Sequence, residues 1–223
     1  MELATFFPEA RAFLNELASN NSREWFNARR DRYERVLRQP AEAFCERAGR
    51  ELEALVGTPM RPRVFRIHRD VRFSRDKTPY NTHLHIGFST AGEVERRLCG
   101  GFFFGIEPHC LVIGAGTLAF PDDVLAAYRE RIAHGPEGDR LAALLKELAD
   151  AGFRWEEAEL KRIPQGCDPL HPHAGLLRRK SLAVFIDLPP EQATGDPVEI
   201  FLTQAGRLLP FHVWISGLRS FLA

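Results

Sequence analysis

Cysteine is scarce in this sequence, and its arrangement builds neither a crosslink nor a structural metal site. The four cysteines, Cys45, Cys99, Cys110 and Cys167, are far apart, and no two of them form a CxxC pair. This spacing is typical neither of a disulfide framework nor of a zinc ribbon. We therefore expect reduced thiols, most of them buried in the core.

Long apolar runs and net charge are also absent. No stretch of about 18 apolar residues occurs, which excludes an ordinary membrane-spanning helix. The first residues, MELATFFPEARAF, lack the basic start and apolar run of a signal peptide, so we expect a cytoplasmic protein. Thirty Lys and Arg side chains balance thirty Asp and Glu side chains, so overall charge does not favour nucleic-acid or membrane binding. No phosphate-binding GxxxxGK[ST] loop is present.

The chain has 223 residues, of which 44% are hydrophobic, and this is enough for one large domain. Apolar spacing predicts three helices within residues 1–60, the second opened by an Asn21–Glu24 capping box. Strands are expected at about 64–73, 83–89, 100–107 and 109–117, with a fifth at 182–188. Further helices are expected at 121–134, 139–149 and 198–222, with Pro210 kinking or breaking the last one.

Since no helix alternates with the consecutive strands, the order of elements favours an α+β fold. We predict a single domain over residues 1–223, with a mainly antiparallel sheet of about five strands packed against several helices. It comprises a helical segment at 1–60, a sheet core at 61–120, and the C-terminal helices and last strand at 121–223. Glycines inside the predicted strands mark bends or the close approach of a packing helix or a ligand.

Residues 64–85, VFRIHRDVRFSRDKTPYNTHLH, hold the densest group of reactive side chains. Apolar and polar residues alternate along 64–73, so Phe65 and Phe73 are predicted to be buried in a strand whose other face is polar. After a turn-like run, His83 and His85 alternate with apolar residues. If the two strands pair as a wide hairpin, their polar faces lie on the same side.

The same stretch is strongly basic. From residue 61 to residue 80 it carries seven Arg or Lys side chains and two Asp side chains, a local excess of +5 in a neutral chain. Arginine forks suit carboxylate or phosphate groups, and a row of like charges is costly without an anion to offset it. The pattern therefore indicates either an anion-binding pocket or a sheet face laced with Arg–Asp pairs. A later basic triplet, residues 178–180, adds to this site or forms a solvated turn.

Each polar side chain receives a candidate role. For catalysis we consider the side chains that transfer protons or orient the reacting group: Asp70, Asp76, Lys77, Tyr80 and His83. For ligand binding we consider Arg66, Arg69, Arg72 and His85. The loop with Cys167, His171 and His173 offers too few rigid ligands, so no metal site is predicted.

The stretch also resembles a known family. The pattern FRI-x-RD-x-RFS-x-DK-x-PY-x-x-H is similar to the signature of the Domain of Unknown Function 2461 family of bacterial and fungal conserved hypothetical proteins. Residues 20–26, 101–104, 107–108, 160–164 and 168–172 resemble further motifs of that family. His68 and Asn81 depart from its common pattern. The resemblance covers almost the whole chain and implies a shared fold and a site in this stretch, but no reaction.

The residues support three functions. The first is binding of, or a reaction on, a small anionic ligand such as a phosphate or nucleotide. The second is a non-catalytic module for nucleic acid or an acidic partner protein, which the neutral total charge and the expected burial of Phe65 and Phe73 disfavour. The third is a structural Arg–Asp network. The sequence leaves the cofactor, the oligomeric state and enzymatic activity open, and it indicates no membrane partner.

Overall fold

The computed structural model describes residues 3–90 and 100–218. Five strands form one antiparallel sheet in the order β1-β2-β3-β4-β5. They are β1 (Met60–Val64), β2 (Leu84–Thr90), β3 (Gly101–Ile106), β4 (Leu111–Thr117) and β5 (Leu182–Leu188). The predicted α+β class with an antiparallel sheet of five strands is confirmed.

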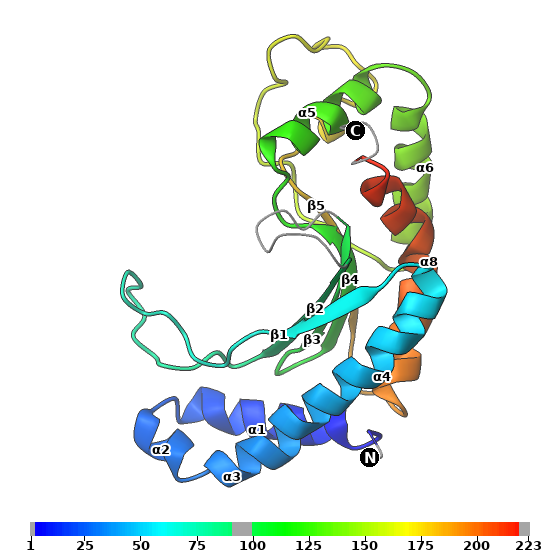
Figure 1. The fold of residues 1–223 in the computed structure, drawn as a ribbon. Helices are drawn as coiled ribbons and strands as arrows, with labels where there is room; N and C mark the ends of the chain where they lie inside the picture. Colours follow the sequence, from blue (N-terminus) through cyan, green and yellow to red (C-terminus); the bar gives the residue numbers. More distant parts are fainter. Residues whose placement is uncertain (1–2, 91–99, 219–223) are drawn as a thin grey trace. The chain divides into compact units, whose positions relative to one another are not determined.

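Helices precede, interrupt and follow the strands (Figure 1). Before the sheet come α1 (Phe6–Ser19), α2 (Arg23–Asn27), α3 (Arg30–Tyr33), the π-helical turn η1 (Glu34–Arg38) and α4 (Gln39–Val56). Between β4 and β5 lie α5 (Asp122–Ala133), α6 (Glu137–Asp150) and α7 (Ala174–Leu177), and α8 (Pro197–Ser216) follows β5. None of the described helices is both long and apolar enough to cross a bilayer.

Contacts between Cα atoms divide the chain into two compact units that interleave in sequence. Unit 1 comprises Met1–Ala91, Phe103–Ile113 and Asp187–Gln204. Unit 2 comprises Gly92–Phe102, Gly114–Ile186 and Ala205–Ala223.

Aromatic rings form the core of unit 1. The Phe44 side chain on α4 is fully buried and lies within ring contact of four other phenylalanines. These partners are Phe6, Phe88, Phe104 and Phe201. Burial of large aromatic side chains is the strongest stabilising contribution available to such a small unit. The cluster therefore joins α1 and α4 to strands β2 and β3.

In unit 2, Tyr128 of α5 is fully buried and donates its hydroxyl to the Leu176 carbonyl at 3.1 Å. Its ring stacks on Phe120 at 4.8 Å. Leu141, Leu145 and Leu148 of α6 are also buried. Glycines in β4 accommodate the neighbouring strand, since a Cβ at Gly114 would collide with the Phe185 ring. The close neighbour is thus a strand of the same sheet.

The strand predicted at 64–73 is wrong. Strand β1 ends at Val64, which pairs with Ile86, and residues 65–83 form a long connection called here the β1–β2 loop (Figure 1). Asp70 and Asp76 each accept a hydrogen bond from the backbone N–H two residues further on. Such side-chain turns compete with strand pairing, and the alternating pattern alone did not reveal this competition.

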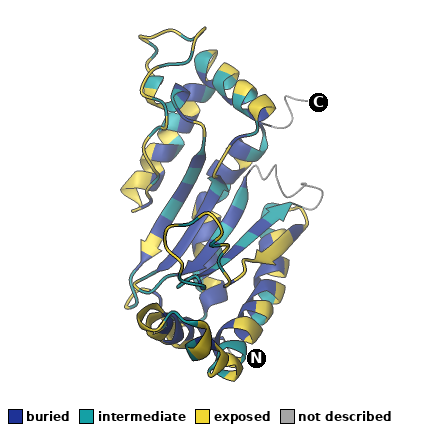
Figure 2. Cartoon of the chain, turned by 90° about the vertical axis from the view of Figure 1, so that its left-hand side faces the viewer, coloured by how far each residue is buried: buried dark blue, intermediate teal, exposed yellow. Residues whose placement is uncertain are grey.

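The predicted burial of Phe65 and Phe73 is also wrong. Phe65 is 45% exposed and Phe73 is 94% exposed, whereas Ile67 is buried. Figure 2 shows the β1–β2 loop as a mostly exposed segment over a buried sheet. Because residues 65–73 form no strand, their alternating side chains do not share a buried face. The alternation of apolar and polar residues in this stretch therefore does not identify core residues.

Two smaller predictions also change. Ser22, rather than Asn21, caps α2, because its side chain accepts from the Trp25 N–H at 3.2 Å. Pro210 lies inside α8, so the predicted helix break is wrong. Buried side chains on both sides of Pro210, including Phe201 and Phe211, outweigh a proline cost of about 3 kcal/mol.

Cys45 and Cys167 are free thiols, as expected. Cys45 is buried, whereas Cys110 and Cys167 are half-buried, so the expected burial is wrong for two of the three described cysteines. Burial raises the pKa of the Cys45 thiol to about 12. Cys99 lies outside the described residues.

Replacing Phe44 by Ala removes the centre of the unit 1 core. We expect the free energy of unfolding to fall by about 3–5 kcal/mol, because the substitution removes buried apolar surface and leaves a cavity, and both effects destabilise the fold. Urea denaturation followed by circular dichroism measures the change. Phe73→Ala is the matched control, since Phe73 is almost fully exposed and should change stability by less than about 0.5 kcal/mol. A large loss in the control would contradict the exposed loop.

Candidate functional site

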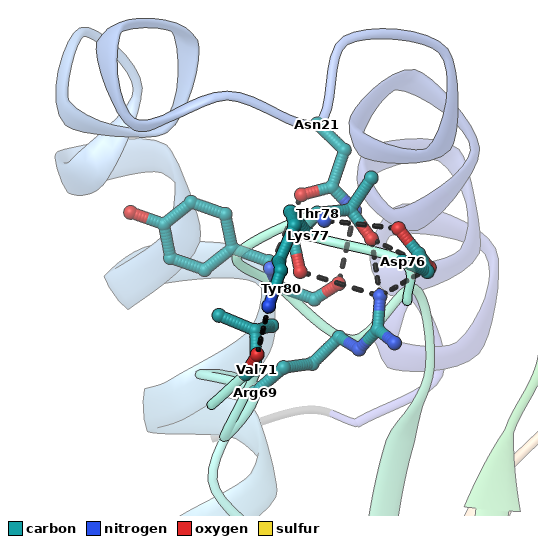
Figure 3. A network of polar contacts seen from close by, with 7 residues as sticks. All are labelled: Asn21, Arg69, Val71, Asp76, Lys77, Thr78 and Tyr80. Atoms are coloured by element: carbon teal, nitrogen blue, oxygen red, sulfur yellow. Dashed lines mark hydrogen bonds and ion pairs between the residues drawn. The ribbon is translucent and has the colours of Figure 1, made fainter. Parts of the chain in front are cut away.

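A polar network organises the tip of the β1–β2 loop (Figure 3). The Arg69 guanidinium donates to the Asp76 carboxylate at 2.5 Å and to both oxygens of Thr78. Asp76 in turn accepts from the Thr78 backbone N–H at 2.9 Å and from its hydroxyl at 3.0 Å. Arg69 and Asp76 therefore act together to hold the turn.

This network sets the protonation of Asp76. Hydrogen bonds from the Thr78 backbone, then from Arg69 and the Thr78 hydroxyl, lower the pKa of Asp76 to about 2. A carboxylate with so low a pKa is a weak base at neutral pH. Its contacts suit an orienting role better than the proton-transfer role considered from the sequence.

Asp70 and Arg72 form a second pair in the loop. Arg72 donates to both carboxylate oxygens of Asp70, with distances of 2.7–3.2 Å, and this hydrogen bonding lowers the pKa of Asp70. Both side chains are exposed, with 58% and 76% of their side-chain surfaces accessible. An exposed pair of this kind contributes little stability.

Asn21 anchors the far end of the loop to the helical part of unit 1. Its amide donates to the Tyr80 carbonyl at 2.9 Å, and its carbonyl accepts from the Tyr80 N–H at 3.1 Å (Figure 3). The Tyr80 ring is buried and stacks on Phe26 at 4.1 Å. Tyr80 thus serves as an anchor, and its burial removes it from the exposed polar surface of the loop.

The remaining basic side chains of the loop are accessible. Lys77 donates to the Val71 carbonyl at 3.0 Å and is otherwise exposed (Figure 3). Arg66 and Arg75 are exposed, and neither forms an ion pair with a carboxylate of the described residues. Two carboxylates offset two arginines, so three cationic groups of the loop have no carboxylate partner within residues 3–90 and 100–218.

A second polar cluster lies at the sheet itself. His83 and His85 are two positions apart in the sequence. Their rings stack with centroids 3.8 Å apart and an interplanar angle of 12°. The Nε2 atom of His85 forms a 2.6 Å hydrogen bond with the Glu107 carboxylate, at the end of the neighbouring strand β3. All three residues are half-buried. One ligand atom from each lies within 4.8 Å of the others.

The electrostatics of this cluster disfavour the protonated form of His83 and favour the ionised form of Glu107. Burial, followed by the charge on His85, lowers the pKa of His83, and the positive charge of Arg69 acts in the same direction. Burial alone would raise the pKa of Glu107. The hydrogen bond from His85 and the histidine charges outweigh this effect, so the pKa of Glu107 is lowered.

The structure brings together some of the candidate residues and separates others. Arg69 joins Asp76, Arg72 joins Asp70, and His83 joins His85. Within the described residues, no hydrogen bond or ion pair links the two histidines to the Asp70–Arg72 pair. The predicted convergence of both polar strand faces therefore fails, because the first strand does not exist.

Glu107 is the partner that the sequence interpretation missed. The sequence places it at the end of the third predicted strand and in a segment that resembles a family motif, with no role in the site. The sequence did contain a signal for this contact. An acidic residue at the end of one strand can reach the two histidines of an HxH pattern when the two strands are neighbours in the sheet. Its pairing with His85 required the strand order, which is a tertiary property.

Unit 2 contains a separate open groove of about 720 Å³. Its lining includes the small residues of α6, Trp155, Arg178 and Arg179. Arg179 is only 7% exposed and donates to the Glu156 carbonyl at 2.8 Å, so this part of the basic triplet is not a solvated turn. The Nε atom of Arg178 is buried without a hydrogen-bond partner among the described residues.

Asn21→Ala should loosen the β1–β2 loop. Two part-buried hydrogen bonds to the Tyr80 backbone are lost, and we expect a destabilisation of about 1–3 kcal/mol. Hydrogen exchange at the Tyr80 amide should accelerate as the loop opens. Asn20→Ala is the matched control, because the Asn20 side chain contacts only the exposed Glu16 carbonyl. Equal exchange at Tyr80 in the two variants would contradict the anchor.

Asp76 should titrate with a midpoint of about 2 in a carboxyl carbon NMR titration. Because its folded-state pKa lies below the ordinary value, its stabilising contribution is present above that value and is lost as the pH falls through about 2. Arg69→Gln should raise the midpoint toward the ordinary value and leave Asp70 unchanged. An unaltered Asp76 midpoint in this variant would exclude Arg69 as a cause.

Comparison with known proteins identifies the family but no activity. No curated protein matches the sequence. The model of a conserved hypothetical protein family, DUF2461, matches residues 9–214, which include the β1–β2 loop, the two histidines and Glu107. The match spans most of the chain and confirms the resemblance seen in its motifs. The chain belongs to the conserved hypothetical protein family DUF2461.

Proposed function

We propose that the β1–β2 loop binds a small phosphate-bearing ligand, such as a nucleotide or a phosphorylated metabolite. The observation that carries the proposal is the uncompensated charge of the loop. Asp70 and Asp76 are each engaged by one arginine, while Arg66, Arg75 and Lys77 remain accessible. Like charges held in one loop repel, and an anion relieves that repulsion.

The chemistry of these three groups fits phosphate. Arginine presents a planar set of donors that matches phosphate oxygens, and lysine adds a compact point charge. The Arg69–Asp76–Thr78 network and the Asn21 anchor hold the loop backbone between them. A loop held in this way loses less conformational entropy on binding than a free one. Arg69, Arg72 and the two aspartates then act by positioning the loop.

A thermal-shift screen with inorganic phosphate and common nucleotides tests this proposal. A ligand at about one hundred times its Kd should stabilise wild type by about 2.7 kcal/mol. The Arg66→Ala/Arg75→Ala double variant and Lys77→Ala should lose most of that shift. Arg30→Ala, which removes an exposed arginine of α3, is the matched control and should retain it. Equal shifts in all four proteins, or no shift in wild type, would refute binding at the loop.

A second candidate, binding of single-stranded nucleic acid, is favoured by the exposed aromatic rings. Phe73 is 94% exposed and lies under the Arg72 guanidinium at 5.8 Å, and Phe65 is 45% exposed beside Arg63 at 5.5 Å. Bases stack on such rings while nearby cations contact the phosphates. The predicted burial of Phe65 and Phe73 disfavoured this function, but neither ring is buried in the structure.

The two candidates differ in their response to ligand length, salt and Phe73. A mononucleotide site should bind mono- and oligonucleotides alike and tolerate Phe73→Ala. A strand-binding surface should prefer oligonucleotides, lose affinity steeply with added salt, and weaken by about 1–3 kcal/mol in Phe73→Ala. Fluorescence anisotropy with labelled mononucleotide and labelled oligonucleotide at two salt concentrations separates them.

A further inference from the structure

We propose that His83, His85 and Glu107 bind a divalent transition-metal ion, for which Zn²⁺ is the reference ion. The cluster lies outside the charged loop tip, and this inference does not depend on the proposed phosphate binding. It rests on three side chains of the right chemistry, brought within one coordination sphere by two neighbouring strands.

The donor set is suited to such a metal. Two imidazole nitrogens and one carboxylate oxygen form a common three-residue set for catalytic zinc and for other divalent transition metals. Imidazole is a poor ligand for Mg²⁺ and Ca²⁺, which prefer oxygen. The cluster therefore predicts selectivity for Zn²⁺, Co²⁺ or Ni²⁺ over Mg²⁺.

The distances fit a metal site after a small adjustment. Ligand atoms at about 2.0–2.2 Å from a tetrahedral zinc ion lie roughly 3.3 Å from one another. Here the three ligand atoms lie within 4.8 Å of one another, and the His85–Glu107 hydrogen bond is 2.6 Å long. For neutral His85 to bind the metal through Nε2, its ring proton would move to Nδ1, and the metal would then separate the two atoms slightly.

The surrounding structure holds the ligands in place. Phe103 packs edge-on against the His85 ring at 4.9 Å, and the Glu107 N–H donates to the Cys110 carbonyl at 2.9 Å. A Cβ at Gly105 would lie 3.2 Å from the His85 ring, so glycine leaves room for this ring. His85 lies in strand β2, while His83 and Glu107 lie one residue outside β2 and β3, so each ligand is held in or directly beside a strand.

The cluster also leaves a side open to solvent. The His85 and Glu107 side chains retain 27% and 30% of their accessible surface. Three protein ligands with an accessible fourth position are typical of a catalytic metal site, in which water or substrate completes the coordination. The other charges that reach the cluster are Arg69 near His83 and Asp187 near Glu107, and these are opposite in sign.

A paired histidine and carboxylate without metal would be the simpler role for these residues. That role uses His85 and Glu107 and gives His83 no function. The parallel stacking of His83 on His85 places a third donor atom beside the pair. The geometry thus accounts for all three side chains only when they share a ligand.

Isothermal titration calorimetry with ZnCl₂ on EDTA-treated protein tests the site. Wild type should bind one Zn²⁺ per chain, and excess Mg²⁺ should not compete. Because loss of a group behind a ligand already costs about 10–100-fold in affinity, loss of the ligand itself in His83→Ala, His85→Ala or Glu107→Gln should cost at least about 100-fold. His109→Ala is the matched control, because His109 is exposed and two residues from Glu107, and it should bind as wild type does.

A measurement on wild type avoids dependence on variants that fold poorly. Imidazole nitrogen NMR during the Zn²⁺ titration should shift the signals of His83 and His85, out of the eight histidines of the chain. Zinc binding that leaves both signals in place, or the absence of any zinc binding, would overturn the proposal. Retained affinity in well-folded His83→Ala and His85→Ala would overturn it as well.

Discussion

The two faces of strand β2 are the constraint on which the site depends. Leu84, Ile86 and Phe88 are buried, and Phe88 lies in the aromatic cluster around Phe44. Because side chains alternate along a strand, burial of these three forces His83 and His85 onto the opposite side. Strand β3 then supplies Glu107 beside them. The aromatic core of unit 1 thus determines the position of the polar cluster, although no side chain belongs to both.

The β1–β2 loop follows a different principle. Its backbone is shaped by side-chain turns at Asp70 and Asp76, by the amide of Asn21 and by an isolated β-bridge between His68 and Tyr80, and not by a regular pair of strands. This allows a segment with many cations to stay ordered without a regular partner. Both carboxylates are used to hold the loop, and the cations they leave unmatched are exposed. Residues of the same few types therefore either hold the loop or lie exposed on it.

Much of the site could be predicted in composition but not in arrangement. The local excess of positive charge and the pair of histidines are visible as residue types in residues 64–85. The interpretation failed at Phe65 and Phe73, since alternation indicated a strand, while the aspartates whose side-chain turns compete with strand pairing were considered only as catalytic residues. Glu107 was missed because its neighbours in sequence indicate only a turn. Its role arises from contact with a residue 22 positions away.

By itself, the sequence determined the α+β class, the positions of strands β2 to β5 and the family, because hydrophobic periodicity and motifs are local properties. It also determined which residues carry charge and which are able to bind a metal. Only the tertiary structure decided where β1 ends, which side chains of the loop are exposed, and that His83, His85 and Glu107 share one place. The reason is physical: strand pairing and burial depend on how groups that are distant in the sequence compete for contacts. The sequence of one segment does not show the outcome of that competition.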